Sequence, residues 1–269
     1  MHDAPRWSQA AGWTGDGLRR EVFFFESGGV RLYGSLYAAA EPVRPVGVVV
    51  CPSWGNEADR GDRLAHGIAC GMADLGGAGV VFDYPGYGDS AGDPEAMTMD
   101  ALAAAASDAC AAGAARFPDA GWIVAGLMFG ASVACLGAAR AAAGGLLLVQ
   151  PSLSPSAYLD RVQRSANRSN LSGELQERVA YGYALPRGLD EAGPELDASV
   201  AAALETFRGR GACVRYADTP KRDPDPEQLE LVEAPGRWRF GAKAYPELAA
   251  AARGWLDRST RDSEAVSSG

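Results

Sequence analysis

The chain has 269 residues, of which 47% are hydrophobic, and this length and apolar content suffice for one globular domain with a large core. Its formal net charge of −9 comes without the clusters of Lys and Arg that neutralise phosphates, so a nucleic acid is not an expected partner. The five cysteines show no Cys-x-x-Cys spacing, which predicts buried free thiols, no metal site and a cytoplasmic location.

The first part of the chain predicts an arm and a hairpin. Residues 1–18 are mostly polar, lack the pattern of a secretory signal and are expected to form a loosely attached arm. Two apolar runs, 21–26 and 30–37, flank Ser27-Gly-Gly29, and this pattern is typical of two antiparallel strands joined by a tight turn.

From residue 46 onward, strand and helix patterns alternate. Continuous apolar runs at 46–51, 79–83 and 145–150, and a strand with the following turn at 121–130, predict strands that are buried on both faces. Helical patterns fall between them at 60–75, 96–116 and 131–143. Such alternation predicts right-handed crossovers and a mostly parallel, doubly wound sheet. Segment 122–139 is uncharged, but its glycines favour a strand followed by a helix over a membrane span.

The last third of the chain predicts a lid and the end of the domain. Residues 152–211 are more polar and are expected to hold a small helical lid, with helices near 157–165 and 198–208. Strands at 212–217 and 229–233 and a helix at 245–256 complete a domain expected to span residues 19–258. Residues 259–269 are expected to form a disordered polar tail.

Met128 stands at the most informative position of the chain. The turn Gly126-Leu-Met-Phe-Gly130 lies between a buried strand and an Ala-rich helix, which is the setting of the Gly-x-Ser-x-Gly nucleophile elbow in the α/β-hydrolase fold. A thioether has no proton to lose and forms no hydrolysable acyl intermediate. The pattern therefore predicts this fold, with its antiparallel N-terminal hairpin, and closes the usual covalent route.

The other members of a Ser-His-Asp triad are also incomplete. The loop at 234–240, where this fold places the catalytic histidine, contains none, and the only histidines are His2 in the arm and His66 in the first crossover helix. His66 is either a base or a half-buried histidine held by a neighbour. Asp218 stands at the position of the acid that orients the histidine, and Asp223 and Asp225 follow it. Without a histidine to orient, these aspartates either have another role, which the sequence does not assign, or are solvated loop acids.

The loop after the 46–51 strand holds the remaining polar candidates. This fold places one N–H of the oxyanion hole here, and Gly55 and Asn56 permit a tight turn. Glu57 acts as a general acid or base in a desolvated pocket, or else caps the next helix. The candidate catalytic residues are Ser53, Glu57 and His66, and the expected pocket consists of Ser53, Trp54, Gly55, Asn56, Met128, Phe129, Gln150 and Trp238.

Other nucleophiles and cofactors have weaker support in the sequence. Ser132 lies inside the helix after the elbow, where a back-bond to the helix backbone is expected, and Cys135 is expected in the core. Cys51 is a further candidate. The Gly-rich stretch 76–79 precedes a strand and no P-loop is present, so no cofactor is expected.

Several motifs within residues 46–250 resemble one branch of the superfamily, the exosortase-A-system-associated hydrolases of the second type. The motifs lie at 50–57, 82–90, 126–131, 148–151, 158–159, 180–183 and 235–238. That family also lacks the usual serine and histidine, so the resemblance implies that the degenerate triad is inherited. Its members tend to carry arginine at the position of Met128 and proline at that of Ser53, and these differences fall in the expected pocket.

Three functions fit these observations. The first is a protein with a degenerate triad that binds a small or carrier-bound acyl or polyketide-like ligand and promotes cyclisation, rearrangement or acyl handover without a covalent serine. The second is a non-catalytic partner, in a homodimer or in a heterodimer with an intact hydrolase paralogue. The third is an ester or thioester hydrolase or acyltransferase with a non-standard nucleophile.

Overall fold

One large sheet organises the molecule. The computed structural model describes residues 11–13, 17–166, 179–180, 183–184, 193–219, 226–237 and 245–267. In these residues, nine strands form a sheet in the order β1-β2-β3-β5-β4-β6-β7-β10-β11. They are β1 Ala11–Trp13, β2 Arg19–Ser27, β3 Val30–Ala38, β4 Val46–Cys51, β5 Ala78–Phe82, β6 Gly121–Leu127, β7 Gly145–Val149, β10 Gly211–Tyr216 and β11 Glu230–Ala234.

Helices fill the connections between the strands. The α-helices are α1 Ala58–Asp74, α2 Met99–Ala114, α3 Gly130–Arg140, α4 Pro155–Ala166, α7 Gly193–Glu205 and α8 Pro246–Ser267. Two short 3-10 turns, η1 Gly55–Glu57 and η2 Pro94–Ala96, precede α1 and α2, and a separate two-stranded ribbon joins β8 Val179–Ala180 to β9 Tyr183–Ala184.

The sheet is mostly parallel with an antiparallel N-terminal hairpin, as the sequence predicted. Strands β2 and β3 pair antiparallel, and β3 also pairs antiparallel with β5, whereas β5, β4, β6, β7, β10 and β11 run parallel to one another. The apolar strands β4 to β7 are almost completely buried because helices cover both of their faces. Segment 122–139 divides into β6 and α3, as expected.

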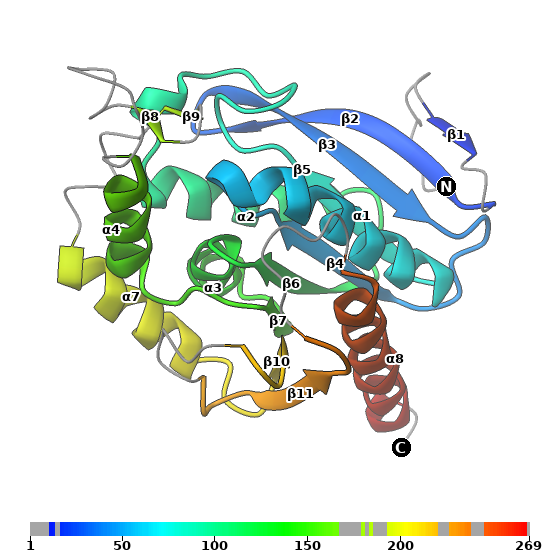
Figure 1. Cartoon of the computed structure of the whole chain (residues 1–269). Coiled ribbons are helices and arrows are strands. Elements are labelled where there is room, and N and C mark those ends of the chain that lie inside the picture. The colour runs from blue at the N-terminus through cyan, green and yellow to red at the C-terminus, as the bar shows by residue number, and fades with distance from the viewer. Residues whose placement is uncertain are drawn as a thin grey trace.

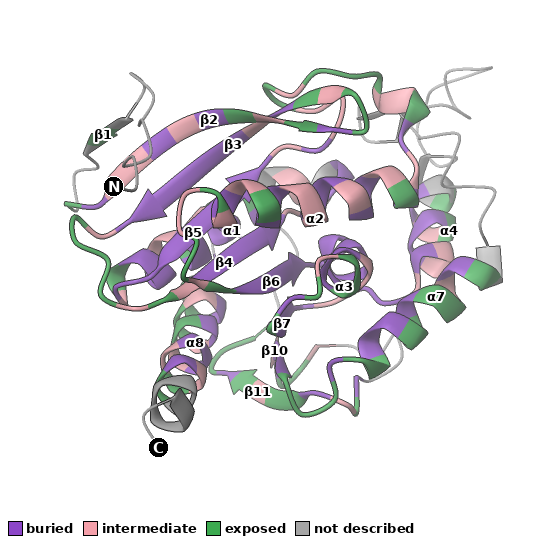
Figure 2. Cartoon of the chain, turned by 180° about the vertical axis from the view of Figure 1, so that it is seen from behind, coloured by how far each residue is buried: buried purple, intermediate pink, exposed green. Residues whose placement is uncertain are grey.

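Two helical layers enclose the sheet. Helices α2, α3 and α7 lie on one side and α1 and α8 on the other (Figure 1). The first layer contributes Leu102, Val133 and Leu204 to one apolar cluster, and the second contributes Ile68 and Leu248 to another. In Figure 2 the central strands are buried, while β11 at the edge of the sheet is largely exposed.

The N-terminal arm is attached more firmly than expected. Residues Ala11–Trp13 form β1, which pairs antiparallel with β2 through Ala11–Glu21 and Trp13–Arg19, and Leu18 is buried. An edge strand presents unpaired N–H and C=O groups, and pairing with another segment satisfies them. The expectation of a loose arm over residues 1–18 is therefore wrong for 11–13 and for 17–18.

The C-terminal tail was also expected to lack structure, but α8 continues to Ser267. Arg44 donates from Nη1 to Asp257 Oδ1 at 3.0 Å and to Thr260 Oγ1 at 2.8 Å, which ties the helix to the body. Arg261 donates to Asp257 one turn away, and such pairs favour helix continuation. The expectation of a disordered tail is thus wrong from Ser259 to Ser267.

The expected lid region contains one helix of the main helical layers. Helix α7 carries Val200 and Leu204 into the same apolar cluster as α2 and α3. Asp197 of α7 accepts hydrogen bonds from Ser154 Oγ at 2.8 Å and from the Ser156 backbone N–H at 3.1 Å, next to the start of α4. Helix α7 therefore packs against α3 and the start of α4, within the region 152–211 where the sequence predicted the lid helices.

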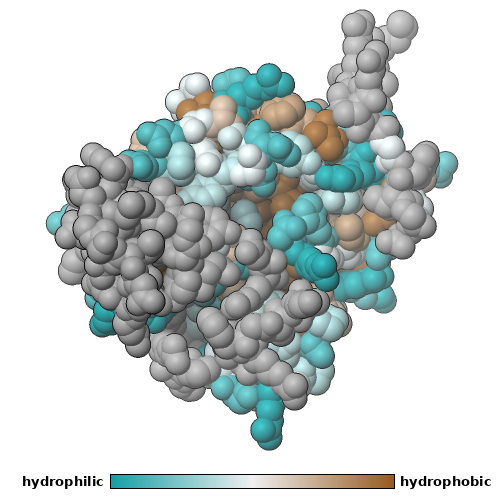
Figure 3. Space-filling model, turned by 45° about the horizontal axis from the view of Figure 1, so that its top comes forward, coloured by the Kyte–Doolittle hydropathy of each residue, from teal (hydrophilic) through white to brown (hydrophobic). Residues whose placement is uncertain are grey.

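Apolar side chains are dispersed on the visible surface. In Figure 3 hydrophobic residues occur in separate groups among hydrophilic ones. The large exposed apolar side chains, Phe24, Val43 and Leu231, come from different elements. None of the helices in the described ranges has both the length and the apolar character needed to cross a membrane.

Candidate functional site

The elbow between β6 and α3 keeps a left-handed backbone at Met128. Its φ is +53°, a region that residues other than glycine adopt at a cost. A Cβ at Gly126 would collide with the Gly130 carbonyl, and a Cβ at Gly130 would collide with the Pro52 carbonyl. Because Gly126 is packed against the start of α3 and Gly130 against the loop after β4, the two glycines of the motif are needed for the geometry of the elbow.

The Met128 side chain contributes to the core. It is 4% exposed and belongs to the apolar cluster under α1 and α8. Its backbone N–H donates to Val149 at 3.0 Å, and its carbonyl accepts from the Ser152 N–H at 2.9 Å. The elbow is therefore tied on both sides of Met128 to the segment that ends β7.

Gln150, which follows β7, lies beside the elbow and carries the least satisfied polar group of this region. It is 7% exposed and has a left-handed φ of +49°. Its Oε1 accepts from Thr219 Oγ1 at 2.9 Å, whereas its buried Nε2 has no hydrogen-bond partner. A buried amide nitrogen without an acceptor costs free energy and is available to an oxygen atom of a ligand.

The loop after β4 has the tight turn that its sequence predicted, with Gly55 at a φ of +66°. Trp54 in this loop is 1% exposed and donates from Nε1 to Tyr87 Oη at 2.7 Å. Its ring centroid lies 5.8 Å from that of Phe129 and 6.2 Å from that of Tyr158, whose hydroxyl donates to the Trp54 carbonyl at 3.0 Å. Trp54 and Phe129 thus form an aromatic support below the loop.

A cavity of about 400 Å³ opens between this loop and the loop after β5. Its lining brings together three of the predicted residues, Ser53, Trp54 and Gly55, with four that the sequence analysis did not select, Asp62, Asp83, Tyr84 and Tyr87. Burial raises the pKa of Asp83 against the lowering effect of a hydrogen bond from the Asp89 backbone N–H, and the Asp89 and Asp62 carboxylates add to the rise. A hydrogen bond from His66 lowers the pKa of Asp62, whose side chain is largely exposed at the edge of the cavity. Two carboxyl groups in one cavity are thus shifted in opposite directions, a pattern seen in acid–base pairs.

Solved structures with the same topology match nearly the whole chain. Est1E from Butyrivibrio proteoclasticus with bound ferulic acid has a TM-score of 0.59 and 15% identity, over 88% of this chain and 98% of that chain. An α/β serine hydrolase without a lid from Xanthomonas campestris has a TM-score of 0.56 and 15% identity, over 93% and 97%. The thioesterase domain from the curacin biosynthetic pathway has a TM-score of 0.54 and 16% identity, over 90% and 99%.

The chain has the α/β-hydrolase fold. No protein-family model matches it, and no curated protein matches it in sequence. Identities of about 15% establish a common architecture and leave the reaction to be argued from the site itself.

The alternative nucleophiles occupy enclosed positions in this α/β-hydrolase fold. Ser53 is 3% exposed, and its Oγ donates to the Glu57 carbonyl at 3.0 Å. Ser132 is fully buried and donates to the Ser152 carbonyl at 2.7 Å, so the expected bond to its own helix is replaced by one to the loop after β7. Burial raises the pKa of the Cys51 thiol well above its ordinary value and that of Cys135 to about 12, which keeps both protonated.

The candidate bases have other contacts. His66 Nδ1 lies 2.9 Å from Tyr37 Oη, and His66 Nε2 lies 3.4 Å from Asp62 Oδ1. Glu57 is the N-cap residue of α1 but makes no side-chain capping bond, because its helical backbone, with φ −80° and ψ −21°, lacks the extended geometry of a side-chain cap. Asp218, at the acid position, is exposed, and the next residue, Thr219, contacts Gln150.

Some predicted residues cannot be placed. His2, Asp223, Asp225 and Trp238 lie outside the described residues, and Asn56 is described only as part of η1. Thr219 was not among the residues predicted from the sequence, although its position directly after Asp218 in the turn that ends β10 was a usable signal. The same is true of Asp83 and Tyr87, which belong to the quoted motif at 82–90.

Proposed function

We propose that this chain binds the carbonyl end of an acyl or polyketide-like ligand beside its elbow and promotes a non-covalent reaction, such as cyclisation, rearrangement or acyl handover. The observation that carries the proposal is the buried Gln150 amide, whose Nε2 has no protein acceptor. It lies next to an elbow that has kept its left-handed backbone while its side chain has no hydroxyl.

Backbone conformation supports a binding role at this edge of the sheet. Residues Met128 and Gln150 both have positive φ values and follow the neighbouring strands β6 and β7. Each such residue costs about 1–3 kcal/mol, and strain of this kind concentrates at functional sites. In this fold the N–H after the nucleophile position, here that of Phe129, serves the oxyanion hole. A ligand carbonyl oxygen that accepts from Phe129 N–H and Gln150 Nε2 would supply the buried amide with its missing partner. The strained turn would then serve to hold the Phe129 N–H in position for this bond.

Related folds make an acyl ligand reasonable. The solved structures with this architecture include a thioesterase domain from the curacin biosynthetic pathway, Est1E with bound ferulic acid, and DcsB with a substrate analogue, the last at a TM-score of 0.54 and 18% identity. We also propose membership of the exosortase-A-system-associated branch, which rests on the motifs quoted above. In that branch the missing serine and histidine are the inherited condition.

The two aspartates of the 400 Å³ cavity are the groups proposed to move protons. Asp83, whose pKa is raised, would act as the acid, and Asp62, whose pKa is lowered, would remain an anion that accepts a proton or orients His66. This assignment requires no covalent intermediate.

The test is calorimetric titration of the full chain with N-acetylcysteamine thioesters of medium-chain and 3-oxo acids. Gln150→Glu preserves the shape of the side chain and an acceptor for Thr219 but replaces the donor by a carboxylate oxygen. We expect it to weaken binding at least fivefold, since leaving a buried hydrogen-bonding group without its partner costs about 1–3 kcal/mol. The matched control is Asp218→Asn, which replaces a carboxylate by an amide on an exposed side chain next to Thr219. It should leave the affinity within twofold.

Equal affinity of Gln150→Glu and the wild type would refute the carbonyl-binding role. Intact-mass analysis after treatment with a fluorophosphonate and with the thioester addresses the alternative of a covalent hydrolase. A single stoichiometric adduct on Ser53, Ser132 or Cys51 would support that alternative, whereas an unmodified chain that still binds thioester supports non-covalent action. A chain that binds no thioester but forms a stable complex with an intact hydrolase paralogue would favour the partner role.

A further inference from the structure

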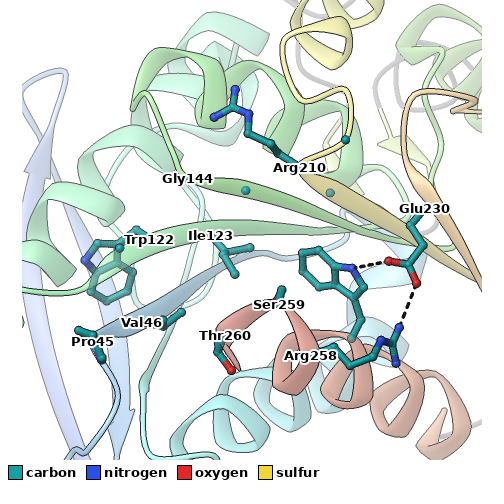
Figure 4. A pocket seen from close by; sticks show the side chains of 15 residues that line it. Pro45, Val46, Trp122, Ile123, Gly144, Arg210, Glu230, Arg258, Ser259 and Thr260 are labelled. Atoms are coloured by element: carbon teal, nitrogen blue, oxygen red, sulfur yellow. Dashed lines mark hydrogen bonds and ion pairs between the residues drawn. The ribbon is translucent and has the colours of Figure 1, made fainter. Parts of the chain in front are cut away.

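A cavity at the amino ends of the strands holds charged groups that already have partners. It has a volume of about 600 Å³ and opens where β4, β6, β7 and β10 begin, next to α8 (Figure 4). Glu230 at its rim accepts from Trp255 Nε1 at 3.1 Å and from Arg258 Nη2 at 3.0 Å, and Arg210 donates to the Thr206 carbonyl. A different arrangement is found beside the 400 Å³ cavity, at the other end of the sheet.

His66 lies beside the 400 Å³ cavity and is connected to it through Asp62. Both residues are on α1, one turn apart, and Asp62 is part of the cavity lining whereas His66 is not. His66 Nε2 lies 3.4 Å from Asp62 Oδ1, the distance of a long hydrogen bond. On the other side of the ring, His66 Nδ1 lies 2.9 Å from the hydroxyl of Tyr37 on β3. The imidazole therefore joins the antiparallel hairpin to a carboxylate at the edge of the cavity.

Tyr37 presents a buried hydroxyl to His66. The residue is 6% exposed, and its ring is nearly perpendicular to the His66 ring, with 82° between the planes and 5.6 Å between the centroids. The guanidinium carbon of Arg20, on β2, lies 5.8 Å from the centre of the Tyr37 ring. Burial raises the pKa of the Tyr37 hydroxyl against the opposing effect of Arg20, so the hydroxyl keeps its hydrogen at neutral pH. Tyr37 is therefore able to donate a hydrogen bond to the imidazole.

The two contacts of the His66 ring agree with a single tautomer. An ionised carboxylate only accepts hydrogen bonds, so the hydrogen of a neutral imidazole must be on Nε2, the nitrogen that faces Asp62. Nδ1 is then an acceptor, and the Tyr37 hydroxyl is the donor beside it. In a histidine, the hydrogen bond made by one ring nitrogen decides which state the other nitrogen has. Tyr37 and Asp62 thus favour the same tautomer from opposite sides of the ring.

The carboxylate of Asp62 acts in turn on Asp83. Burial is the largest cause of the raised pKa of Asp83, and the negative charge of Asp62 adds to the rise. A Cβ at Gly88 would collide with the Asp83 carboxylate, so the loop after β5 covers this group closely. The titratable and charged groups around this set come from α1, the hairpin and the segment after β5, and they are Arg20, Tyr37, Asp62, Arg63, His66, Cys70, Asp83 and Asp89.

We propose that Tyr37, His66 and Asp62 form a hydrogen-bonded relay, with Tyr37 Oη donating to His66 Nδ1 and His66 Nε2 donating to Asp62, so that the first two are positioning residues for the carboxylate of the third. The relay keeps Asp62 as the anion and leaves the proton of the carboxyl pair on Asp83. Its functional consequence rests on the proposed role of the two aspartates in moving protons, whereas the relay itself belongs to the chain without a ligand.

The first test is the tautomer of His66, read from long-range ¹H–¹⁵N NMR correlations of the ¹⁵N-labelled full chain. His2 and His66 are the only histidines in the sequence, so His2→Gln leaves the signals of a single imidazole. The spectra are recorded at pH 8, above the ordinary titration range of histidine. We expect one tautomer, with the shift of a protonated nitrogen at Nε2 and that of an unprotonated nitrogen at Nδ1.

Two phenylalanine variants separate the relay from general packing of the hairpin. Tyr37→Phe keeps the ring and removes Oη, so the Nδ1 signal of His66 should move toward the value of a nitrogen that accepts no hydrogen bond. The matched control is Tyr33→Phe on the same strand, because the Tyr33 hydroxyl contacts Arg20 and Ser35. This variant should leave both nitrogen signals of His66 unchanged.

The second test is a carbon-detected NMR titration of the side-chain carboxyl groups. Asp62→Asn removes a negative charge and should lower the pKa of Asp83 relative to the wild type. His66→Leu removes the donor to Asp62 and should raise the pKa of Asp62, and Tyr37→Phe should raise it by a smaller amount. A role of Tyr37 in packing alone would leave the pKa of Asp62 unchanged.

The relay is wrong if His66 carries its hydrogen on Nδ1, or if the two tautomers are mixed, because Tyr37 would then not fix the ring. These results come from a chain with only His2 changed, so they do not depend on whether the other variants fold. The relay is also wrong if Tyr37→Phe leaves the Nδ1 signal in place. Equal thioester affinity of Gln150→Glu and the wild type would refute the carbonyl-binding role and would not affect the relay.

Discussion

The left-handed backbone at Met128 reverses the usual stability order of alanine and glycine at that position. Met128→Ala and Met128→Gly remove nearly the same buried side chain, so each should cost about 2–5 kcal/mol from lost packing. The two variants differ in how well each new residue tolerates a φ of +53°. In that region the backbone strain of alanine lowers stability by about 1–2 kcal/mol, whereas glycine has no such strain.

Glycine also gains entropy in the unfolded chain, which lowers its stability by about 0.4–1 kcal/mol relative to alanine. The difference leaves Met128→Gly more stable than Met128→Ala by about 0.5–1 kcal/mol. The matched control is Phe129, the next residue, which is fully buried but has a right-handed φ of −59°. There, only the entropy of the unfolded chain acts, so Phe129→Ala should be more stable than Phe129→Gly.

The assay is urea unfolding of the four variants followed by tryptophan fluorescence, with midpoints and m-values compared within each pair. The refuting result is the same order, alanine above glycine, at both positions. The elbow would then relax to a negative φ once the thioether is removed. In that case the left-handed turn would depend on Met128 itself, and packing around Gly126 and Gly130 would not impose it.

Three further outcomes follow from the structure. Native protein at pH 7.5 should react with one iodoacetamide, on the half-buried Cys70, because burial keeps the other four thiols inaccessible. The denatured protein should react with five. Several adducts on the native protein in mass spectra would contradict this prediction. Arg44→Ala removes two hydrogen bonds to α8 and should lower the free energy of unfolding by about 1 kcal/mol. It should also speed amide hydrogen exchange over residues 257–267. Unchanged exchange there would show that the helix is stable without this contact. Burial raises the pKa of Asp83, so wild-type stability should fall as pH rises from about 3.9 through that raised pKa. Asp83→Asn, which keeps an acceptor for the Asp89 amide, should therefore gain in urea midpoint relative to the wild type between pH 3.5 and pH 7, and a constant difference would speak against a raised pKa.

Most of the fold could be predicted from the sequence because local patterns identify its strands and helices. Continuous apolar runs such as 46–51 and 145–150 identify central strands, since only strands covered on both faces have no polar side. The errors arose where a segment gains its structure from a partner outside itself. Residues 259–267 are helical with Arg44 holding the start of that stretch, and Ala11–Trp13 are a strand because β2 offers an open edge. The pattern of 259–267 does not report Arg44, some two hundred residues away, and the pattern of 11–13 does not report that β2 has an open edge.

The elbow shows the same division within the candidate site. From its sequence alone, the turn at 126–130 could be recognised as an elbow without a nucleophile, because the glycine spacing and the absence of a hydroxyl are both local. Only the tertiary structure decided what surrounds it. It placed Gln150 beside Met128 with an unpaired amide nitrogen, buried Ser132 and Cys51, and brought Asp62 and Asp83 into one cavity. These properties depend on groups that meet only when β6, β7 and β10 lie side by side. The sequence therefore determined that serine chemistry is lost, and the fold determined which polar groups remain near the elbow.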